Sequence, residues 1–293
     1  MTSRGHEPSS QLAEMRRLMD ENAAAPDSEN VTVTVDHADD VEVWTFTPRD
    51  TTTHFALLHF HGGGYRLGSP RGFARYFARV AEALGTTIHA PKYRLAPDAA
   101  FPAALDDAES AYRWLLEKGV PADRIIVGGD SAGGGLAAAL LLKIHDLGLA
   151  RPGGGALFSP WLDLRVVSRS YDDNAESDRM FSREQANQAT ELYLQGHDAS
   201  DPLASPLLGD WTGQPPLLIH VSDIEVLRDD SQLLAAHAGA AGVSVRLERF
   251  PDTQHVWHNA YPETPQSIAA LDNWRDWLTR ELVPLAPSAA RAT

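Results

Sequence analysis

Residues 124–144 read RIIVGGDSAGGGLAAALLLKI, and the fold is decided in this stretch. Its apolar beginning is typical of a buried strand and leads directly into Gly129-Asp130-Ser131-Ala132-Gly133, which fits the pattern G-x-S-x-G. The small and apolar residues that follow predict a helix. Ser131 is therefore expected on a sharp strand-to-helix turn, where glycines are needed because Cβ atoms would collide and where the helix N-terminus favours negative charge. On this pattern alone, a glycine-rich turn with an incidental serine is the alternative.

Apolar strands and helices alternate on both sides of this stretch. The alternation predicts a mostly parallel, doubly wound sheet with helices on both faces. Two earlier segments, Val31–Val35 and Val41–Phe46, alternate apolar and polar residues and predict an antiparallel hairpin at a sheet edge. The later strands are expected at 55–60, 86–90, 124–129, 155–159, 216–220 and 243–250, and the helices near 71–84, 101–118, 132–147, 229–241 and 265–282.

Two segments fall outside this rhythm. Residues 9–24 place Leu12, Met15 and Met19 at helical spacing and predict a short amphipathic arm. The polar segment between Pro160 and Pro215 carries one expected helix near 183–195, and an insertion of this kind usually covers a site. We therefore predict an N-terminal cap arm (1–30), a catalytic domain (31–283) with a cap insertion at about 165–212, and a flexible tail (284–293).

Composition narrows the class of protein. The 293 residues are 43% hydrophobic and 22% charged, which is typical of a globular chain with a large core. A formal net charge of −15 would repel a phosphate backbone, so we predict no nucleic-acid partner. The sequence has no cysteine, which excludes thiolate nucleophiles and cysteine-ligated zinc. No apolar stretch reaches the roughly 18 residues of a membrane span, and we expect a cytoplasmic protein.

A second glycine-rich turn, His61-Gly62-Gly63-Gly64, follows the expected strand at 55–60. Three glycines allow backbone N–H groups to face a cavity without side chains in the way. We predict that Gly62 and Gly63, together with the N–H of Ala132, stabilise an oxyanion. By itself, HGGG is equally compatible with a flexible turn.

These turns belong to a longer set of motifs in one order along the chain. The set is HGGG at 61–64, YRLAP at 93–97, FPAALDD at 101–107, GDSAGG at 129–134 and SPW at 159–161. Through these motifs the chain resembles, from about residue 30 to 282, the bacterial hormone-sensitive-lipase-like esterases of the α/β-hydrolase superfamily. The resemblance implies the α/β-hydrolase fold, with a mostly parallel eight-stranded sheet, helices on both faces and a small helical cap formed by the arm and the insertion.

An activated serine requires a neighbouring base. His255 and His258 are the histidines that follow the last expected strand, in the loop where this fold presents its base. His255 resembles the family's histidine because it follows a Phe-Pro turn and precedes Val256 and Trp257, and His258 is the alternative. A histidine pair three residues apart without HExxH or cysteine does not indicate zinc, so we predict no metal.

The acid that orients this base is expected after the strand at 216–220, in Asp223-Ile224-Glu225-Val226-Leu227. The family more often has Asp-Pro-Leu-Arg-Asp here, and aligning Leu227 and Asp229 puts Glu225 in the place of the acid. Some members resemble this chain in having Glu-Val-Leu. Asp223 is the alternative, whereas Asp229 and Asp230 are expected to solvate or cap the next helix.

Two neighbouring features are predicted to be structural. Asp130 stands beside Ser131, and we expect it to have a structural role, as a hydrogen-bond partner of the HGGG loop, and no catalytic one. Arg94 and Asp106 are expected to brace a second loop.

Together these residues predict a serine carboxylic-ester hydrolase without metal or cofactor, working through an acyl-enzyme. Ser131 attacks, His255 transfers the proton and Glu225 orients His255. The resemblance implies small-molecule esters with short to medium acyl chains, and residues 61–70, HGGGYRLGSP, resemble members acting on lactones. It also implies a homodimer through the sheet edge at 243–250. An amidase with the same triad and a non-catalytic small-molecule receptor are the alternatives.

Overall fold

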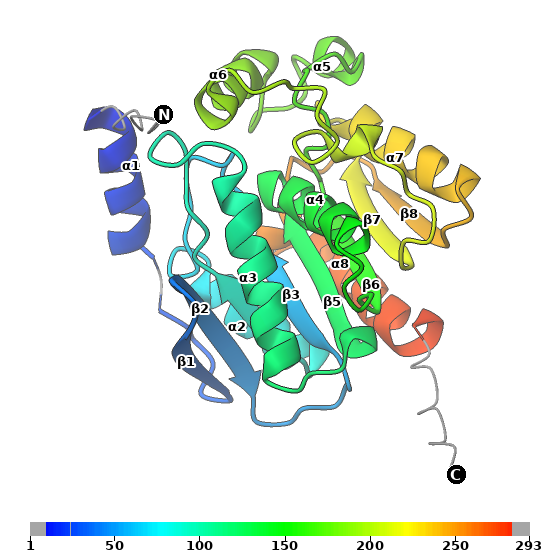
Figure 1. The fold of residues 1–293 in the computed structure, drawn as a ribbon. Coiled ribbons are helices and arrows are strands. Elements are labelled where there is room, and N and C mark those ends of the chain that lie inside the picture. Colours follow the sequence, from blue (N-terminus) through cyan, green and yellow to red (C-terminus); the bar gives the residue numbers. More distant parts are fainter. Residues whose placement is uncertain (1–9, 24, 283–293) are drawn as a thin grey trace.

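The computed structural model describes residues 10–23 and 25–282 and shows one sheet of eight strands with helices on both faces (Figure 1). The expected tail at 284–293 and the first nine residues of the arm lie outside the described residues. The strands are β1 Val31–Ala38, β2 Val41–Pro48, β3 Ala56–Phe60, β4 Thr87–Pro91, β5 Ile125–Asp130, β6 Gly154–Phe158, β7 Leu217–Ser222 and β8 Val245–Phe250. The α-helices are α1 Ser10–Glu21, α2 Ala74–Leu84, α3 Ala103–Glu117, α4 Ala132–Asp146, α5 Ser170–Asp173, α6 Arg183–Leu194, α7 Arg228–Ala240 and α8 Pro265–Asp276.

The strand order is β1-β2-β4-β3-β5-β6-β7-β8. β1 pairs with β2 and β2 with β4 in antiparallel register, and all the later neighbours are parallel. The predicted hairpin and the mostly parallel sheet are thus confirmed. β5 lies in the interior of the sheet between β3 and β6, so the turn that follows it is enclosed by neighbours on both sides.

The core has two layers because successive strand residues face opposite sides of the sheet. Leu58 and Val127 pack with α3, α4 and α7, whereas Leu57 and Ile126 pack with α2 and α8 on the other side. α4 is almost fully buried, which explains its run of alanine, leucine and glycine. This buried helix holds the turn at Ser131 between two rigid elements.

The two irregular segments lie over one end of the sheet. α5 and α6, from the polar insertion, lie beyond the ends of the central strands, and α1 lies to one side of them (Figure 1). Residues of α1 and α6 line a common cavity of about 590 Å³. The division of the chain into a cap and a catalytic domain stays a prediction, but the segments expected to form a cap lie next to each other.

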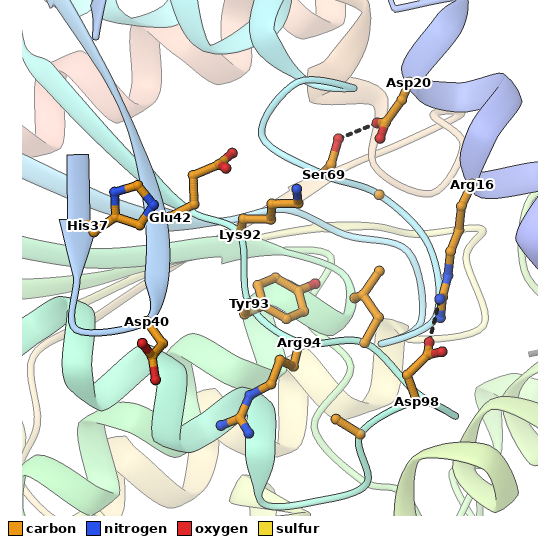
Figure 2. Close-up of a pocket in the computed structure, with 13 residues that line it drawn as sticks. Arg16, Asp20, His37, Asp40, Glu42, Ser69, Lys92, Tyr93, Arg94 and Asp98 are labelled. Carbon is orange, nitrogen blue, oxygen red and sulfur yellow. Dashed lines mark hydrogen bonds and ion pairs between the residues drawn. The ribbon is translucent and has the colours of Figure 1, made fainter. Parts of the chain in front are cut away.

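α1 is attached to two loops by a few polar contacts. Nε of Arg16 donates to the carbonyl oxygen of Arg66 at 2.7 Å, and its guanidinium also pairs with Asp98. One turn later, Asp20 accepts a hydrogen bond from the hydroxyl of Ser69. Figure 2 shows the Arg16–Asp98 and Asp20–Ser69 contacts at the edge of a pocket of about 570 Å³ that is lined by charged side chains. The arm is therefore held by directional polar contacts as well as by the burial of Leu12.

Two expectations about polar residues are wrong. Asp230 does not cap a helix at the surface; it is fully buried and accepts hydrogen bonds from Leu162 N–H, Asp163 N–H and the Ser168 hydroxyl at the start of the insertion. Burial raises the pKa of its carboxyl to about 7 despite these donors.

The second wrong expectation concerns Arg94, which was expected to brace a loop together with Asp106. Arg94 pairs with Asp107 at 2.6 Å, whereas Asp106 pairs with Lys143. Consecutive residues of a helix point in directions about 100° apart, so only one of the two aspartates faces the loop.

In the part of the chain at 10–23 and 25–282, no helix is both long and apolar enough to cross a bilayer. The cytoplasmic location stays a prediction.

Candidate active site

Ser131 lies in a strained turn between β5 and α4. Its backbone has φ 55° and ψ −121°, a conformation that is rare for a residue with a side chain. A Cβ on Gly129 would come within 2.3 Å of Gly133 O, and a Cβ on Gly133 would come within 2.1 Å of Phe60 O. The structure therefore requires glycine on both sides, as the pattern G-x-S-x-G predicts. The turn presents a serine hydroxyl at the end of a buried strand.

His255 and Glu225 lie next to this hydroxyl. Nε2 of His255 is 2.8 Å from Oγ of Ser131, and Nδ1 of His255 is 2.7 Å from Oε2 of Glu225. The other carboxylate oxygen of Glu225 accepts the N–H of Ser222 at 3.0 Å, which holds the carboxylate in place. All three side chains are buried. The structure thus brings together a hydroxyl, an imidazole and a carboxylate in hydrogen-bonding sequence.

The pKa of His255 reflects two opposing effects. Burial favours the neutral imidazole and by itself would lower the pKa, but the hydrogen bond and charge of Glu225 outweigh it and raise the pKa above its ordinary value. The ring of Phe181, from the insertion, stacks on the imidazole with 5.7 Å between ring centroids. The base is therefore shielded from water on one side and paired with an anion on the other.

The alternative candidates lie elsewhere. Asp223 forms an ion pair with Arg249 at 2.7 Å, whereas the imidazole of His255 pairs with Glu225. His258 is buried, with its Nε2 at 3.2 Å from Nδ1 of His220, and burial lowers its pKa far below the ordinary value. Of the two acids and two histidines considered, the structure places Glu225 and His255 at Ser131.

The predicted set of oxyanion donors in the glycine-rich loop requires a correction. The N–H of Gly62 already donates to Oδ2 of Asp130 at 3.0 Å, so the prediction that it donates to an oxyanion is wrong in this structure. The expected bond between Asp130 and the HGGG loop is the reason. Gly64, which sequence reasoning did not select, has a positive φ of 61° and lines the same cavity as Ser131. Among the described residues, none accepts a hydrogen bond from the N–H of Gly63, Gly64 or Ala132.

A cavity of about 270 Å³ lies beside Ser131. Its apolar wall contains Leu67, Phe73, Met180 and Phe181, of which the last two come from the insertion. Arg66, Gln185 and Asn259 add polar groups, and Arg66, Leu67 and Gln185 also line the larger cavity between α1 and α6. These wall residues were missed because they come from separate segments and share no motif. Within the described ranges, no three His, Cys, Asp or Glu side chains are grouped as metal ligands would be.

The class of the protein follows from comparison of this fold and site with known proteins. A family model described as the alpha/beta hydrolase fold matches residues 57–259. Over 216 residues, the chain is 41% identical to an acetyl-hydrolase of Streptomyces hygroscopicus, covering 74% of this chain and 72% of that protein.

Solved structures narrow the class. A double mutant of the esterase E40 superposes with a TM-score of 0.89 at 35% identity, covering 94% of this chain and 93% of that one. A crystal structure of an esterase from the bacterial hormone-sensitive lipase family gives 0.89 at 34% identity, covering 96% and 95%. The chain belongs to the bacterial hormone-sensitive-lipase-like esterase family of the α/β-hydrolase superfamily, and is an enzyme of the carboxylesterase type.

Proposed function

We propose that the protein hydrolyses carboxylic esters through an acyl-enzyme on Ser131. The observation that carries the proposal is the continuous sequence of contacts from Ser131 Oγ to His255 Nε2 and from His255 Nδ1 to Glu225 Oε2, at 2.8 and 2.7 Å. Neutral His255 donates its Nδ1–H to Glu225, which leaves Nε2 free to accept the serine proton. The negative charge of Glu225 then stabilises the imidazolium.

His255 carries the proton in both chemical steps, acylation and deacylation. As Ser131 Oγ bonds to the ester carbonyl carbon, its proton moves to His255 Nε2, and this proton passes to the leaving alcohol oxygen when the ester C–O bond breaks. Water then gives its proton to His255 and attacks the acyl carbon. The imidazolium returns that proton to Ser131 Oγ, and the carboxylic acid is released.

We propose that Gly63, Gly64 and Ala132 donate to the oxyanion of the tetrahedral intermediate. Their N–H groups have no acceptor within the described part of the chain. Ala132 is also the first residue of α4, where the positive end of the helix dipole favours developing negative charge.

The size of the cavity supports short to medium acyl chains. At about 270 Å³, it is smaller than the roughly 300–1,000 Å³ usual for drug-sized ligands. The name acetyl-hydrolase, carried by the relative from Streptomyces hygroscopicus, favours the acetyl group as a substrate element. Lactones are included in the proposal as cyclic esters that the same attack would open.

The experiment that tests this function is a rate series on 4-nitrophenyl esters from acetyl to lauroyl, with a γ-lactone and a matched 4-nitroanilide. We expect the highest kcat/KM between acetyl and hexanoyl and a large preference for the ester over the anilide. An amidase is the second candidate, because the name acetyl-hydrolase does not state whether oxygen or nitrogen carries the acetyl group. Faster anilide than ester hydrolysis would favour it, and no turnover of any member would favour the non-catalytic receptor.

We propose further that two copies associate through β8. β8 is the outermost strand on its side of the sheet, and its residues are partly exposed. An edge strand has unpaired backbone groups that a second copy can satisfy. Sedimentation should give twice the chain mass of 31.9 kDa, and a monomer at micromolar concentration would contradict the proposal.

A further inference from the structure

Arg66 occupies the boundary between the two cavities above the candidate site. With Leu67 and Gln185, it lines both the cavity of about 270 Å³ beside Ser131 and the outer cavity of about 590 Å³ between α1 and α6. Its backbone is held on both sides, because its N–H donates to Gly63 O at 3.1 Å and its carbonyl oxygen accepts from Arg16 at 2.7 Å. The side chain therefore starts from a fixed point.

The guanidinium of Arg66 has no partner among residues 10–23 and 25–282. No carboxylate of these described residues lies within ion-pair distance of it, and its Nε is buried without a hydrogen bond to any of them. Glu191 lines the outer cavity but does not pair with it. Other arginines of the chain do find carboxylates, as Arg94 does with Asp107 and Arg165 with Asp163.

An unpaired, partly buried guanidinium is costly. Burial disfavours its charge and lowers the pKa of Arg66, yet an arginine stays protonated near neutral pH. The protein carries a net charge of −15 and so has many carboxylates from which a structural partner could have come. The cost is recovered if a ligand supplies the missing anion.

The guanidinium also lies beside the glycine-rich loop at 61–64. A Cβ built on Gly64 would be 3.7 Å from Nε and 3.8 Å from Nη2 of Arg66, so the charged group lies over the loop proposed to hold the oxyanion. A purely hydrocarbon acyl group would leave this guanidinium without an anion.

We propose that Arg66 binds a carboxylate carried by the substrate, so that the preferred substrates are esters with one free carboxylate a few bonds from the scissile carbonyl. This inference rests on the proposed ester hydrolysis. A guanidinium pairs with a carboxylate through two parallel hydrogen bonds, which gives orientation as well as affinity. The carboxylate can belong to the acyl part or to the alcohol part of the ester, and the experiment distinguishes these sources.

The test uses two pairs of esters that differ only in charge. For the acyl side, monoethyl succinate is compared with its amide, ethyl succinamate; for the alcohol side, acetoxyacetate is compared with acetoxyacetamide. The readout is the ratio of kcat/KM for the anion to kcat/KM for its neutral twin. We expect wild type to prefer the anion in at least one pair, and Arg66→Gln to lower that ratio about ten- to a hundredfold.

Two further variants make the result specific. Arg66→Lys keeps the charge but cannot form two parallel hydrogen bonds, so its ratio should lie between those of wild type and Arg66→Gln; it also serves as the test if Arg66→Gln does not fold. Arg124→Gln makes the same change in net charge at the amino end of β5, the opposite end from Ser131, and should keep the wild-type ratio.

The inference is overturned if Arg66→Gln keeps the wild-type ratio in both pairs, or if Arg124→Gln lowers the ratio as much. These outcomes leave ester hydrolysis by Ser131 standing, because the neutral esters are still turned over. If wild type hydrolyses none of the four esters and none of the 4-nitrophenyl series, the proposed function itself fails and this inference falls with it.

Discussion

Asp130 accepts a hydrogen bond from the backbone N–H of Gly62 at 3.0 Å, and this contact joins the two glycine-rich turns of the site. A Cβ on Gly62 would lie 2.5 Å from the same carboxylate oxygen, so a larger residue there would displace the Asp130 carboxylate from this bond. Because Asp130 immediately precedes Ser131, the bond sets the position of the HGGG loop relative to the nucleophile. The same bond occupies the N–H of Gly62, so the oxyanion donors that we propose in this loop are the N–H groups of Gly63 and Gly64.

Replacing the proposed nucleophile should abolish activity without loss of the fold. Ser131→Ala is expected to lower kcat by up to roughly 10⁶, because the members of a triad act as a unit. Steady-state rates measure the loss, and circular dichroism checks the fold. An organophosphonate should label Ser131 in the wild type, as peptide mass spectrometry would show. Substantial activity in the variant would refute the assignment.

The two candidate acids should respond very differently. Glu225→Gln keeps the shape of the side chain but removes the charge beside His255, and should lower kcat by about 10⁴ by analogy with triad acids. Asp223→Asn removes an ion pair with the exposed Arg249 and should change kcat little. Side-by-side kinetics decides between them. A crippled Asp223→Asn beside an active Glu225→Gln would mean that the wrong carboxylate has been chosen.

The acid side of the pH profile should report His255. Only the neutral imidazole accepts the serine proton, and Glu225 raises the pKa of His255, so activity should begin to fall above the ordinary value of about 6.5 as the pH is lowered. In Glu225→Gln, burial remains and the raising effect is lost, so the acid limb should move to lower pH. Profiles of kcat/KM against pH measure the acid limb of the wild type and that of the variant. An unmoved limb in the variant would argue against His255 as the titrating base.

The arm should depend on Arg16. Arg16→Ala removes the bonds to Arg66 O and Asp98, and the free energy of local opening of α1 should fall by about 1–3 kcal/mol. Hydrogen exchange of residues 10–21 measures this opening. Arg17→Ala is the matched control, because Arg17 pairs with Glu14 and Glu21 on the same exposed helix. Equal acceleration in both variants would show that the Arg16 contacts do not hold the arm.

Metal removal should have no effect on ester hydrolysis. The proposed steps use the serine, the imidazole and the carboxylate for attack and proton transfer, and none needs a Lewis acid. Prolonged dialysis against EDTA followed by the 4-nitrophenyl assay measures this directly. Inactivation that added zinc reverses would overturn the mechanism.

Much of the site was predictable because its signals are local. The turn at Ser131 depends on about ten consecutive residues, and the need for Gly129 and Gly133 arises from contacts with backbone atoms that any strand-turn-helix of this kind would bring close. His255 was identified from its place after the last strand. The alternation of apolar strands and helices likewise predicted the sheet, because burial on both faces requires it.

Patterns within single segments are enough to predict the fold class, the nucleophile turn and the loop that presents the base. Three features depend on the folded chain: the acid that pairs with His255, the Gly62 N–H that Asp130 occupies, and the guanidinium of Arg66, which has no partner among the described residues. The contacts within the site join residues far apart in the sequence: Glu225 and His255 are 30 positions apart, and His255 and Ser131 are 124 positions apart. A hydrogen bond requires its atoms within a few tenths of an ångström, whereas a motif locates a side chain only to within a residue or two.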